Sequence, residues 1–514
     1  MADLLTNLSS GFGQILNLQT LAYSFLGVFI GTLTGVLPGI GPITAIALLI
    51  PLSFGLDPMS GLIMLIGIYY GSMYGGSTTA ILVRTPGELA SVVTTLDGYE
   101  MAKQGRAGPA LATAAIGSFV AGTFSTLALM LLAPLLALVA YHVGSPEYFL
   151  LIVLALSMVS NLTTGSILKG IIATLFGLAI AMVGLDMQSG VPRYTFGIPN
   201  ISDGIDFILV AIALFALPEA FINLAKPKDA KTEQVQKIKG SLWMTRDDWR
   251  RSAGAYGRGS VMGFIIGVLP GIGPSLASFV SYVTEKRFSK NPERFGKGAI
   301  EGVAGPETAN NAAVGGALVP LFTLGIPGSA TTALLLFIFM MYGLQPGPMM
   351  FQTNPDLLWA IIASMYVGNV MLLLLNLPLV GVFASLLKIP PVPLYIGVVA
   401  FSVLGVYGIN YNVFDLSLLF IFGIIGYLMQ RYGFPLAPTV MALVLAPLLE
   451  QNFRRAMSIS NGDLLMFVKR PVSLGILIFI VLVVILPQIL TLRKYLKNRQ
   501  SPKSSEVEKD ISNN

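Results

Sequence analysis

An identical run of eight residues occurs twice in this chain, and this repeat constrains the fold more than any other feature. Gly35–Pro42 and Gly267–Pro274 both read Gly-Val-Leu-Pro-Gly-Ile-Gly-Pro. Upstream, three glycines at four-residue spacing match, namely Gly27, Gly31 and Gly35 against Gly259, Gly263 and Gly267. Downstream, two further pairs match, namely Gly75-Gly76 and Pro86-Gly87 against Gly315-Gly316 and Pro327-Gly328. The chain therefore consists of two homologous halves.

Long stretches without charge place both halves in a membrane. Of the 514 residues, 54% are hydrophobic and only 11% are charged, whereas soluble proteins average about 25% charged residues. This composition excludes a soluble domain, which would lack the polar surface to cover itself, and it excludes disorder, which needs the opposite balance. We therefore expect an all-α polytopic membrane protein.

A membrane-spanning helix needs about 20 apolar residues, and we expect about twelve such spans. The candidates are Leu21–Leu37, Pro58–Val83, Ala107–Leu132, Glu147–Ser160, Ser166–Gly184, Gly204–Asn223, Gly257–Pro270, Ala299–Gly325, Thr331–Tyr342, Pro355–Asn376, Val392–Gly408, Val413–Gln430, Phe434–Leu449 and Val472–Leu492. Pro42–Leu52 and Pro274–Thr284 are too short to cross, and they are predicted to be half-helices or re-entrant hairpins.

The longest polar segment lies near the middle of the chain and separates the halves. We predict a first membrane repeat at 1–223, a cytoplasmic linker at 224–256, a second repeat with additional helices at 257–492 and a cytoplasmic tail at 493–514. The residues before Gln19 lack the basic start of a secretory signal, so the first apolar stretch is expected to stay as a membrane helix.

Equivalent loops of the two halves carry opposite basic bias. Ser53–Pro58 has no basic residue, whereas its counterpart in the second half carries Lys286, Arg287, Lys290, Arg294 and Lys297. Farther on, the first half has Lys103 and Arg106, and Gly343–Pro348 in the second half has no charge. Because basic loops stay in the cytoplasm, we predict inverted repeats, with a periplasmic N-terminus and a cytoplasmic C-terminus. Many secondary transporters are built this way, with the substrate site at the repeat interface.

Several classes of function lack the residues they need. The chain has no cysteine and one histidine, which excludes disulfide scaffolds, thiol nucleophiles and histidine-based metal clusters. It has no phosphate-binding loop for ATP hydrolysis and no metalloprotease motif. Its basic residues lie in loops and at the C-terminus, so nucleic acid is not an expected partner. Transport against a gradient would therefore need a coupling ion, and we expect no other cofactor.

The Pro-Gly motif cannot continue a regular helix, because proline lacks an N–H donor and glycine prefers other backbone angles. Free backbone groups at membrane depth are tolerated where they line a cavity or are buried in protein. Helix N-termini at such breaks attract anions, and free carbonyls attract cations. We therefore expect substrate or ion contacts at Gly39, Gly41, Gly271, Gly273 and Ser275. The alternative is a kink that packs closely against small residues.

Polar residues inside predicted spans supply further candidates. Glu307, Asn310 and Asn311 lie in one span with no basic residue nearby; a carboxylate there would neutralise a cation or take up a proton. A sodium ion is the candidate near Asn310 and Asn311, and interhelical hydrogen bonding is the alternative.

The first half offers a stretch of hydroxyls and small residues, with Tyr74, Gly75, Gly76, Ser77, Thr78 and Thr79. Pro86 and Gly87 follow, and Gly316, Pro327, Gly328 and Ser329 are the candidates of the second half. Hydroxyls that bond back to their own helix are the alternative for this stretch. Arg84 would clamp a carboxylate, extend toward the membrane surface or pair with Glu88.

At these residues the chain resembles the large membrane subunit of tripartite tricarboxylate transporters. The first half carries the resemblance in Gly35–Pro42, Tyr69–Gly71, Pro86-Gly87-Glu88 and Leu96-Asp97-Gly98-Tyr99. The second half carries it in Gly267–Pro274, Tyr282–Lys286, Phe295–Gly298, Pro306–Ala312 and Leu324–Ser329, and the last part in Leu449–Asn452 and Arg454–Ala456. Arg84 departs from the pattern, because many relatives have asparagine there.

The resemblance implies the permease of a bacterial inner-membrane transporter for citrate-like tricarboxylates or related carboxylates, driven by a sodium or proton gradient. Its partners would be a small four-helix membrane subunit, a periplasmic solute-binding protein, membrane lipid and the carboxylate, with a homodimer as a further expected assembly. A stand-alone secondary carrier of organic anions is the alternative function. A third hypothesis, an intramembrane enzyme, has little support in the residues.

Overall fold

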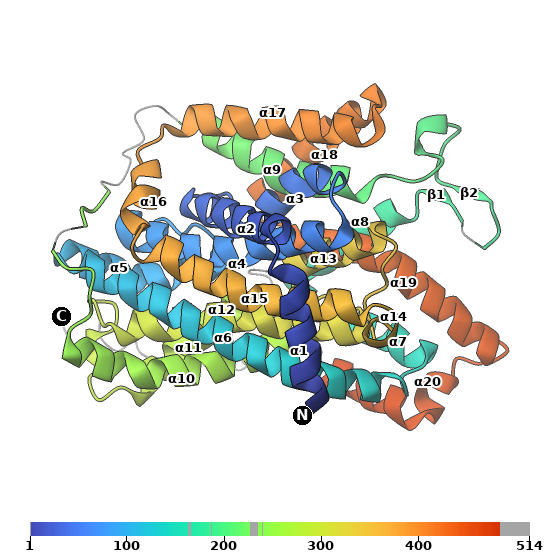
Figure 1. The fold of residues 1–514 in the computed structure, drawn as a ribbon. Helices are drawn as coiled ribbons and strands as arrows, with labels where there is room; N and C mark the ends of the chain where they lie inside the picture. Colours follow the sequence, from blue (N-terminus) through green and yellow to red (C-terminus); the bar gives the residue numbers. More distant parts are fainter. Residues whose placement is uncertain (1, 163–165, 187, 227–234, 239, 484–514) are drawn as a thin grey trace, which may run out of the picture.

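The computed structural model describes residues 2–162, 166–186, 188–226, 235–238 and 240–483, and these are almost entirely helical (Figure 1). The α-helices are α1 (Ala2–Ile15), α2 (Leu18–Val36), α3 (Pro42–Ser53), α4 (Pro58–Val83), α5 (Thr94–Lys103), α6 (Ala107–Ala140), α7 (Ser145–Leu162), α8 (Ile167–Ala181), α9 (Phe207–Leu224), α10 (Arg246–Val268), α11 (Gly273–Phe288), α12 (Glu301–Leu324), α13 (Ala330–Met341), α14 (Met350–Thr353), α15 (Pro355–Asn376), α16 (Val380–Leu386), α17 (Pro391–Asn410), α18 (Val413–Arg431), α19 (Ala437–Ile459) and α20 (Met466–Lys469).

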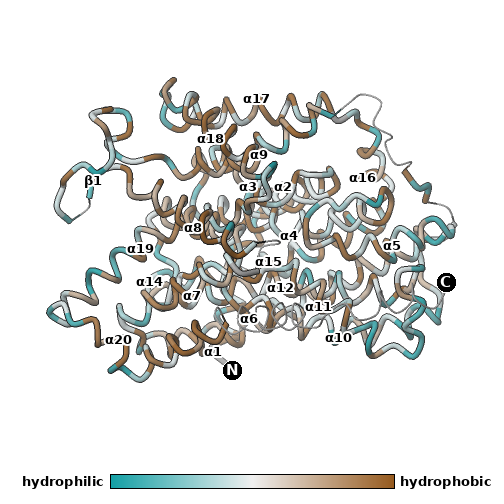
Figure 2. The backbone as a smooth tube through the Cα atoms, turned by 180° about the vertical axis from the view of Figure 1, so that it is seen from behind, coloured by the Kyte–Doolittle hydropathy of each residue, from teal (hydrophilic) through white to brown (hydrophobic). Residues whose placement is uncertain are grey.

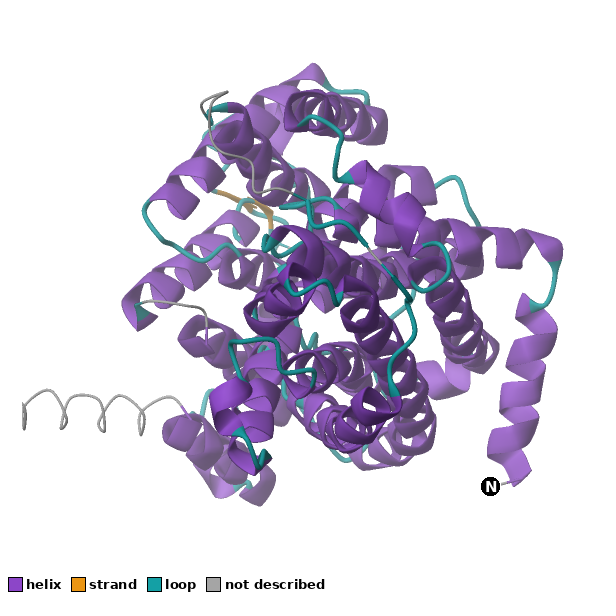
Figure 3. Cartoon of the chain, turned by 90° about the vertical axis from the view of Figure 1, so that its left-hand side faces the viewer, coloured by secondary structure: helices purple, strands orange, loops and turns teal. Residues whose placement is uncertain are grey.

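Besides these helices and an unlabelled apolar helix at Pro471–Val483, the described part of the chain contains short elements. They are the 3-10 helices η1 (Leu89–Val92), η2 (Pro199–Ile201) and η3 (Pro292–Arg294) and an antiparallel pair of strands, β1 (Gly184–Leu185) and β2 (Pro192–Arg193). Figure 3 shows how small this strand pair is beside the helices. The predicted all-α class is therefore confirmed.

Six helices of the described part are long and apolar enough to cross a membrane, namely α2, α6, α9, α15, α17 and α18. Figure 2 shows hydrophobic positions along most of the bundle. The central helices α4 and α12 are 26 and 24 residues long, but they are rich in glycine and polar residues. They are also almost entirely buried, so they form the core that the apolar helices surround.

The glycine repeats bring two pairs of helices together backbone to backbone. A Cβ atom at Gly35 would lie 2.8 Å from the Cα of Ser72, so α2 can approach α4 only because this position has no side chain. In the second half, a Cβ atom at Gly267 would lie 2.7 Å from the Cα of Ala313, which brings α10 equally close to α12. Such stripes of small residues allow close helix packing where lipid supplies no hydrophobic drive.

The same packing shows which residues of the two halves correspond to each other. A Cβ atom at Gly87 would meet the Cα of Gly76 at 2.8 Å, and one at Gly328 would meet the Cα of Ala317 at the same distance. Gly76 therefore corresponds to Ala317, and Gly75 corresponds to Gly316. The sequence pairing of Gly75-Gly76 with Gly315-Gly316 is wrong by one residue, because the turn packs on the position after Gly316 in the second half.

The two halves run in opposite directions. The N–H of Gln236, in the linker, donates to the carbonyl of Leu82 at the C-terminal end of α4 (2.9 Å). At the same end of the molecule, the N–H of Ala299, just before α12 begins, donates to Asp97 (2.7 Å). Thus α4 ends where its counterpart α12 starts, which is the geometry of an inverted repeat.

Some boundaries differ from the expected spans. The α10 helix begins at Arg246, inside the segment predicted as linker, because Thr245 and Asp248 form a capping box there. The α6 helix continues to Ala140, well beyond the predicted Leu132. Of the predicted last span, a helix at Pro471–Val483 is described; the rest of that span and the predicted tail at 493–514 lie outside the described residues, as do 227–234 and 239 of the linker.

A pair of alanine substitutions in α10 tests the glycine contact. Gly263→Ala should destabilise the protein by roughly 1–3 kcal/mol, because overpacking at a tight contact costs that much and the new Cβ would lie 2.6 Å from the Cα of Ala309. Gly257→Ala, in the same helix, meets no atom within 4 Å and is the matched control. Thermal unfolding of both purified variants is the measurement. Equal melting temperatures would contradict the packing described here.

Candidate functional site

The first Pro-Gly break separates α2 from α3. Gly39 adopts a positive φ of 85°, which favours glycine. The hydroxyl of Tyr395, on α17, donates to the carbonyl of Pro38 (2.7 Å). A Cβ atom at Gly39 would overlap the carboxylate of Glu219, on α9. The unwound segment is thus held by two helices that lie far from it in the sequence.

The second break, between α10 and α11, is held by the turn of its own half and by α7 of the first half. A Cβ atom at Gly271 would lie 2.5 Å from a side-chain carbon of Val159 on α7. Gly271 and Gly273 both have positive φ, at 82° and 70°. The N–H of Gly271 donates to the carbonyl of Gly328 (3.0 Å). This half therefore joins its broken helix directly to the turn at Pro327-Gly328.

Each half has a second Pro-Gly turn after its long central helix. Arg84 directly follows α4 and Gly325 directly follows α12, and both residues are left-handed, with φ of 58° and 64°. A polar residue then caps the next short helix: Glu88 caps η1, and Ser329 caps α13. We call the segments 84–92 and 325–332 the first and second hairpins.

The long central helix of each half contacts the hairpin of the other half. The amide of Asn310, on α12, donates to Glu88 Oε1 in the first hairpin (3.2 Å). The hydroxyls of Tyr69, on α4, and Ser329, in the second hairpin, lie 3.3 Å apart. Asn310 and Tyr69 occupy equivalent positions, and so do Glu88 and Ser329. These crossed contacts bring both hairpins to the interface between the halves.

Glu307 is a carboxylate fully buried at this interface. It accepts hydrogen bonds from the hydroxyl of Ser77 (2.5 Å) and from that of Thr94. Among the described residues, no basic side chain lies within 4 Å of Glu307 or Glu88. Charges buried in a protein normally need a partner, so this carboxylate is chemically suited to hold a cation or a proton.

Two amide oxygens beside Glu307 also have no hydrogen-bond partner. The Oδ1 atoms of Asn310 and Asn311 are buried and unbonded, and both residues are fully buried. The Asn311 amide nitrogen donates to Ser118 on α6 (2.7 Å), which fixes its orientation. Buried polar atoms without partners are rare. Oxygen atoms of this kind are the ligands that hard cations prefer.

Several predicted site residues make hydrogen bonds that join helices to one another. The hydroxyl of Tyr74 donates to Asn369 on α15 (2.5 Å), and that of Thr79 donates to the carbonyl of Val36 (2.7 Å). Arg84 is exposed and lies 5.8 Å over the ring of Tyr99. Pairing with Glu88, one of the three alternatives for Arg84, is not found among the ion pairs of the described residues.

The remaining candidates line the two breaks and hairpins. A Cβ atom at Gly41 would lie 3.9 Å from Glu88, and one at Gly273 would lie 3.7 Å from Ser329. Gly75 and Gly316 pack against the backbones of α2 and α10. Thr78 is buried in α4, and Ser275 is half-buried in α11. Pro86-Gly87 and Pro327-Gly328 form the two turns.

The structure adds residues that sequence reasoning did not place in the site, namely Glu88, Thr94, Ser118, Glu219 and Tyr395. Glu88 carried a signal, because it directly follows Pro86-Gly87. Thr94 and Ser118 reach Glu307 and Asn311 only through contacts between the halves. No local pattern could have indicated those contacts.

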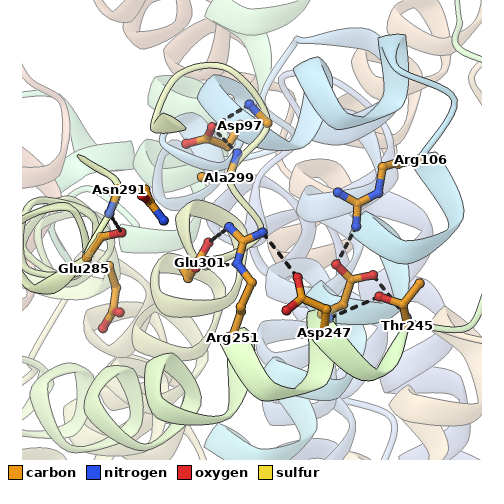
Figure 4. A network of polar contacts seen from close by, with 12 residues as sticks. Asp97, Arg106, Thr245, Asp247, Arg251, Glu285, Asn291, Ala299 and Glu301 are labelled. Carbon is orange, nitrogen blue, oxygen red and sulfur yellow. Dashed lines mark hydrogen bonds and ion pairs between the residues drawn. The ribbon is translucent and has the colours of Figure 1, made fainter. Parts of the chain in front are cut away.

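A polar network closes the linker end of the interface (Figure 4). Asp97 Oδ1 accepts three backbone hydrogen bonds, from Gly296 (2.9 Å), Gly298 (2.8 Å) and Ala299 (2.7 Å). The hydroxyl of Tyr282 donates to its other oxygen (2.9 Å). Two sequence motifs, around Asp97 and Gly298, thus bind each other and tie the first half to the second.

Two ion pairs extend this network. Arg251 lies 2.5 Å from Glu301, and Arg106 lies 2.5 Å from Asp248 at the start of α10. Burial opposes ionisation of Asp248, but hydrogen bonds from Arg106 and Thr245 outweigh it and hold the pKa of this carboxyl below its usual value. The Asp248 pair therefore persists as an ion pair at neutral pH.

Comparison with known proteins gives a clear family. The family model for the "Tripartite tricarboxylate transporter TctA family" matches residues 21–441. The chain is 48% identical over 492 residues to an Agrobacterium vitis protein called "Uncharacterized 52.8 kDa protein in TAR-I ttuC' 3'region", covering 95% of this chain and 98% of that protein. A second Agrobacterium vitis protein, called "Uncharacterized protein in TAR-II ttuC' 3'region", is 48% identical over 230 residues, 44% of this chain and 95% of that protein. No solved structure matches.

Alanine substitutions of two aspartates in the linker-end network, one buried and one exposed, test how much Asp97 stabilises the protein. Asp97→Ala should cost on the order of 3 kcal/mol, because it leaves buried N–H groups without an acceptor. Asp247→Ala is the control, because that side chain is 72% exposed and pairs with Arg251 only at 3.8 Å. The measurement is the melting temperature of each purified variant. An Asp97→Ala protein as stable as Asp247→Ala would show that the loop does not depend on Asp97.

Proposed function

Because the chain belongs to the tripartite tricarboxylate transporter TctA family, we propose that it is the permease subunit of a binding-protein-dependent importer of organic carboxylates. The permease works with a small four-helix membrane subunit and a periplasmic solute-binding protein, and citrate-like tricarboxylates or related carboxylates are its cargo. A sodium or proton gradient supplies the energy. Its place is the bacterial inner membrane, with the N-terminus periplasmic and the linker and C-terminus cytoplasmic.

The crossed contacts between the halves carry this proposal. Asn310 reaches the first hairpin and Tyr69 reaches the second, so broken helices from inverted halves meet at one interface. This is the arrangement in which secondary transporters bind their substrates near the middle of the membrane. The site needs no enzyme chemistry, since its groups bind and orient ligands.

The electrostatics of the interface support a site for an anion and a cation together. The N-terminal end of α13, which Ser329 caps, carries the partial positive charge of a helix N-terminus and favours a carboxylate. The buried Glu307 carboxylate and the unbonded oxygens of Asn310 and Asn311 favour a cation, with sodium as the candidate. Occupancy of both places would make transport of an anion depend on the gradient of a cation.

Uptake into proteoliposomes tests the proposed function. Vesicles holding this chain and its small partner subunit receive labelled tricarboxylates, in sodium or potassium buffer, with and without the cognate binding protein. The proposal expects uptake that requires the binding protein and a sodium or proton gradient. Equal uptake without the binding protein would contradict it and indicate a stand-alone carrier of organic anions.

Asparagine substitutions test the location of the site. Asn310→Ala and Asn311→Ala should each abolish uptake, because each removes a buried polar group at the hairpin interface, while insertion into the membrane stays intact. Asn376→Ala is the matched control. Asn376 is also a buried intramembrane asparagine with an unbonded Oδ1, but its amide donates to Thr32 on α2 (3.3 Å), away from the hairpins. Unchanged uptake in both test variants would exclude this site.

A further inference from the structure

The two hairpins have equivalent backbones but different chemistry. At the position after the Pro-Gly turn, the first hairpin has Glu88 and the second has Ser329. At the facing position on the other half's central helix, Glu88 meets Asn310, whereas Ser329 meets Tyr69. One hairpin therefore presents a carboxylate and an amide, and the other presents two hydroxyls. If both hairpins bound the same chemical group, they would not need different side chains.

We infer that the two hairpins have divided the ligands between them, and that the first hairpin is the cation subsite, with the Glu88 carboxylate and the Asn310 carbonyl oxygen as ligands. This inference rests on the proposed function, since it assigns the coupling cation to one side of the proposed site. The ligand is a monovalent cation, either a sodium ion or a proton. The second hairpin, which has no carboxylate of its own, is left for the substrate anion.

The unbonded oxygen of Asn310 is the first observation behind this inference. Asn310 is fully buried, and its amide nitrogen is already used by Glu88. Its Oδ1 has no partner. A buried carbonyl oxygen next to a carboxylate with no basic neighbour within 4 Å makes a cluster of oxygen ligands without a counter-charge. A bound cation would supply both the missing partner and the missing charge.

The second observation is that the first half makes room for Glu88. A Cβ atom at Gly76 would lie 3.0 Å from Glu88 Cγ and 2.9 Å from Ser91 Oγ. The equivalent residue of the second half is Ala317, beside the smaller Ser329. In each half, the size of the hairpin side chain thus matches the residue on the central helix: the larger Glu88 faces Gly76, and the smaller Ser329 faces Ala317. Glu88 is therefore accommodated by its surroundings and is not a chance surface residue.

The third observation concerns Glu307, one helical turn before Asn310. Glu307 on α12 and Tyr69 on α4 are titratable groups near enough to the Glu88 carboxylate for their charges to affect one another. Two carboxylates beside one hairpin repel a substrate anion until a cation neutralises one of them. The order of binding follows: the cation binds first, and the carboxylate substrate binds second. Such an order couples the two fluxes, because the substrate site forms only when the cation is present.

The test measures cation binding without transport. The purified full-length chain is unfolded thermally across a sodium titration, with N-methyl-glucamine holding the ionic strength constant, and across a pH titration without sodium. We expect sodium or protons to raise the melting temperature of the parent chain. Glu88→Gln should weaken that response at least tenfold in cation concentration, and Glu88→Ser, which copies the second hairpin, should do the same. Glu100→Gln is the control, because the ion pair that the structure describes for Glu100 is with Lys103 at the end of α5 (3.1 Å).

The two titrations distinguish the sources of positive charge. A response to sodium that Glu88→Gln weakens identifies sodium as the ligand, and a response to pH alone that it weakens identifies a proton. The inference is overturned if Glu88→Gln responds as strongly as the parent chain to the cation that stabilises the parent. It is also overturned if neither sodium nor protons raise the melting temperature of the parent chain.

Uptake measured on the same variants separates the two claims. Cation-driven carboxylate uptake that survives Glu88→Gln with the same cation dependence overturns the cation subsite and leaves the proposed function standing. Cation binding through Glu88 in a chain that transports no carboxylate would overturn the proposed function and support the cation subsite.

Discussion

The close approach of α2 to α4, and of α10 to α12, is the constraint on which the rest of the structure depends. Because glycine has no side chain, the backbones of these helices can touch. Helices that pack so closely hold their ends in fixed positions. Each stripe of glycines runs directly into a Pro-Gly break. The contact therefore delivers the unwound segment of each half to a defined place beside the hairpin of that half, and the crossed contacts join the two places.

The interface combines groups that would be costly to bury without a ligand. Within the described part of the chain, Glu307 is satisfied only by hydroxyl donors, and two amide oxygens beside it remain unbonded. Polar groups of this kind inside a membrane protein mark ion or substrate pathways. At the linker end, by contrast, every carboxylate of the Asp97 network has donors or a basic partner. Polar groups that stabilise the fold and polar groups suited to a ligand are thus found in different parts of the same interface.

The sequence predicted the helical membrane class and the helix breaks, because apolar runs and the Gly-Pro repeat are local patterns. Thr245 and Asp248 also contained a readable signal for the start of α10, although the segment was assigned to the linker. The register of Gly75 with Gly316 could not be predicted, since packing of the turn sets it. Contacts such as Thr94 with Glu307, or Tyr395 with Pro38, join residues remote in sequence, and only the fold brings them together.

We propose that the two hairpins from the inverted halves form one site. The most direct measurement is an experimental structure of the chain with its small partner subunit, a tricarboxylate and sodium. We expect anion density beside the hydroxyls of Ser329 and Tyr69, and cation density beside the Glu88 carboxylate and the Asn310 side-chain oxygen. Anion density enclosed by one half alone, or located away from both hairpins, would contradict it.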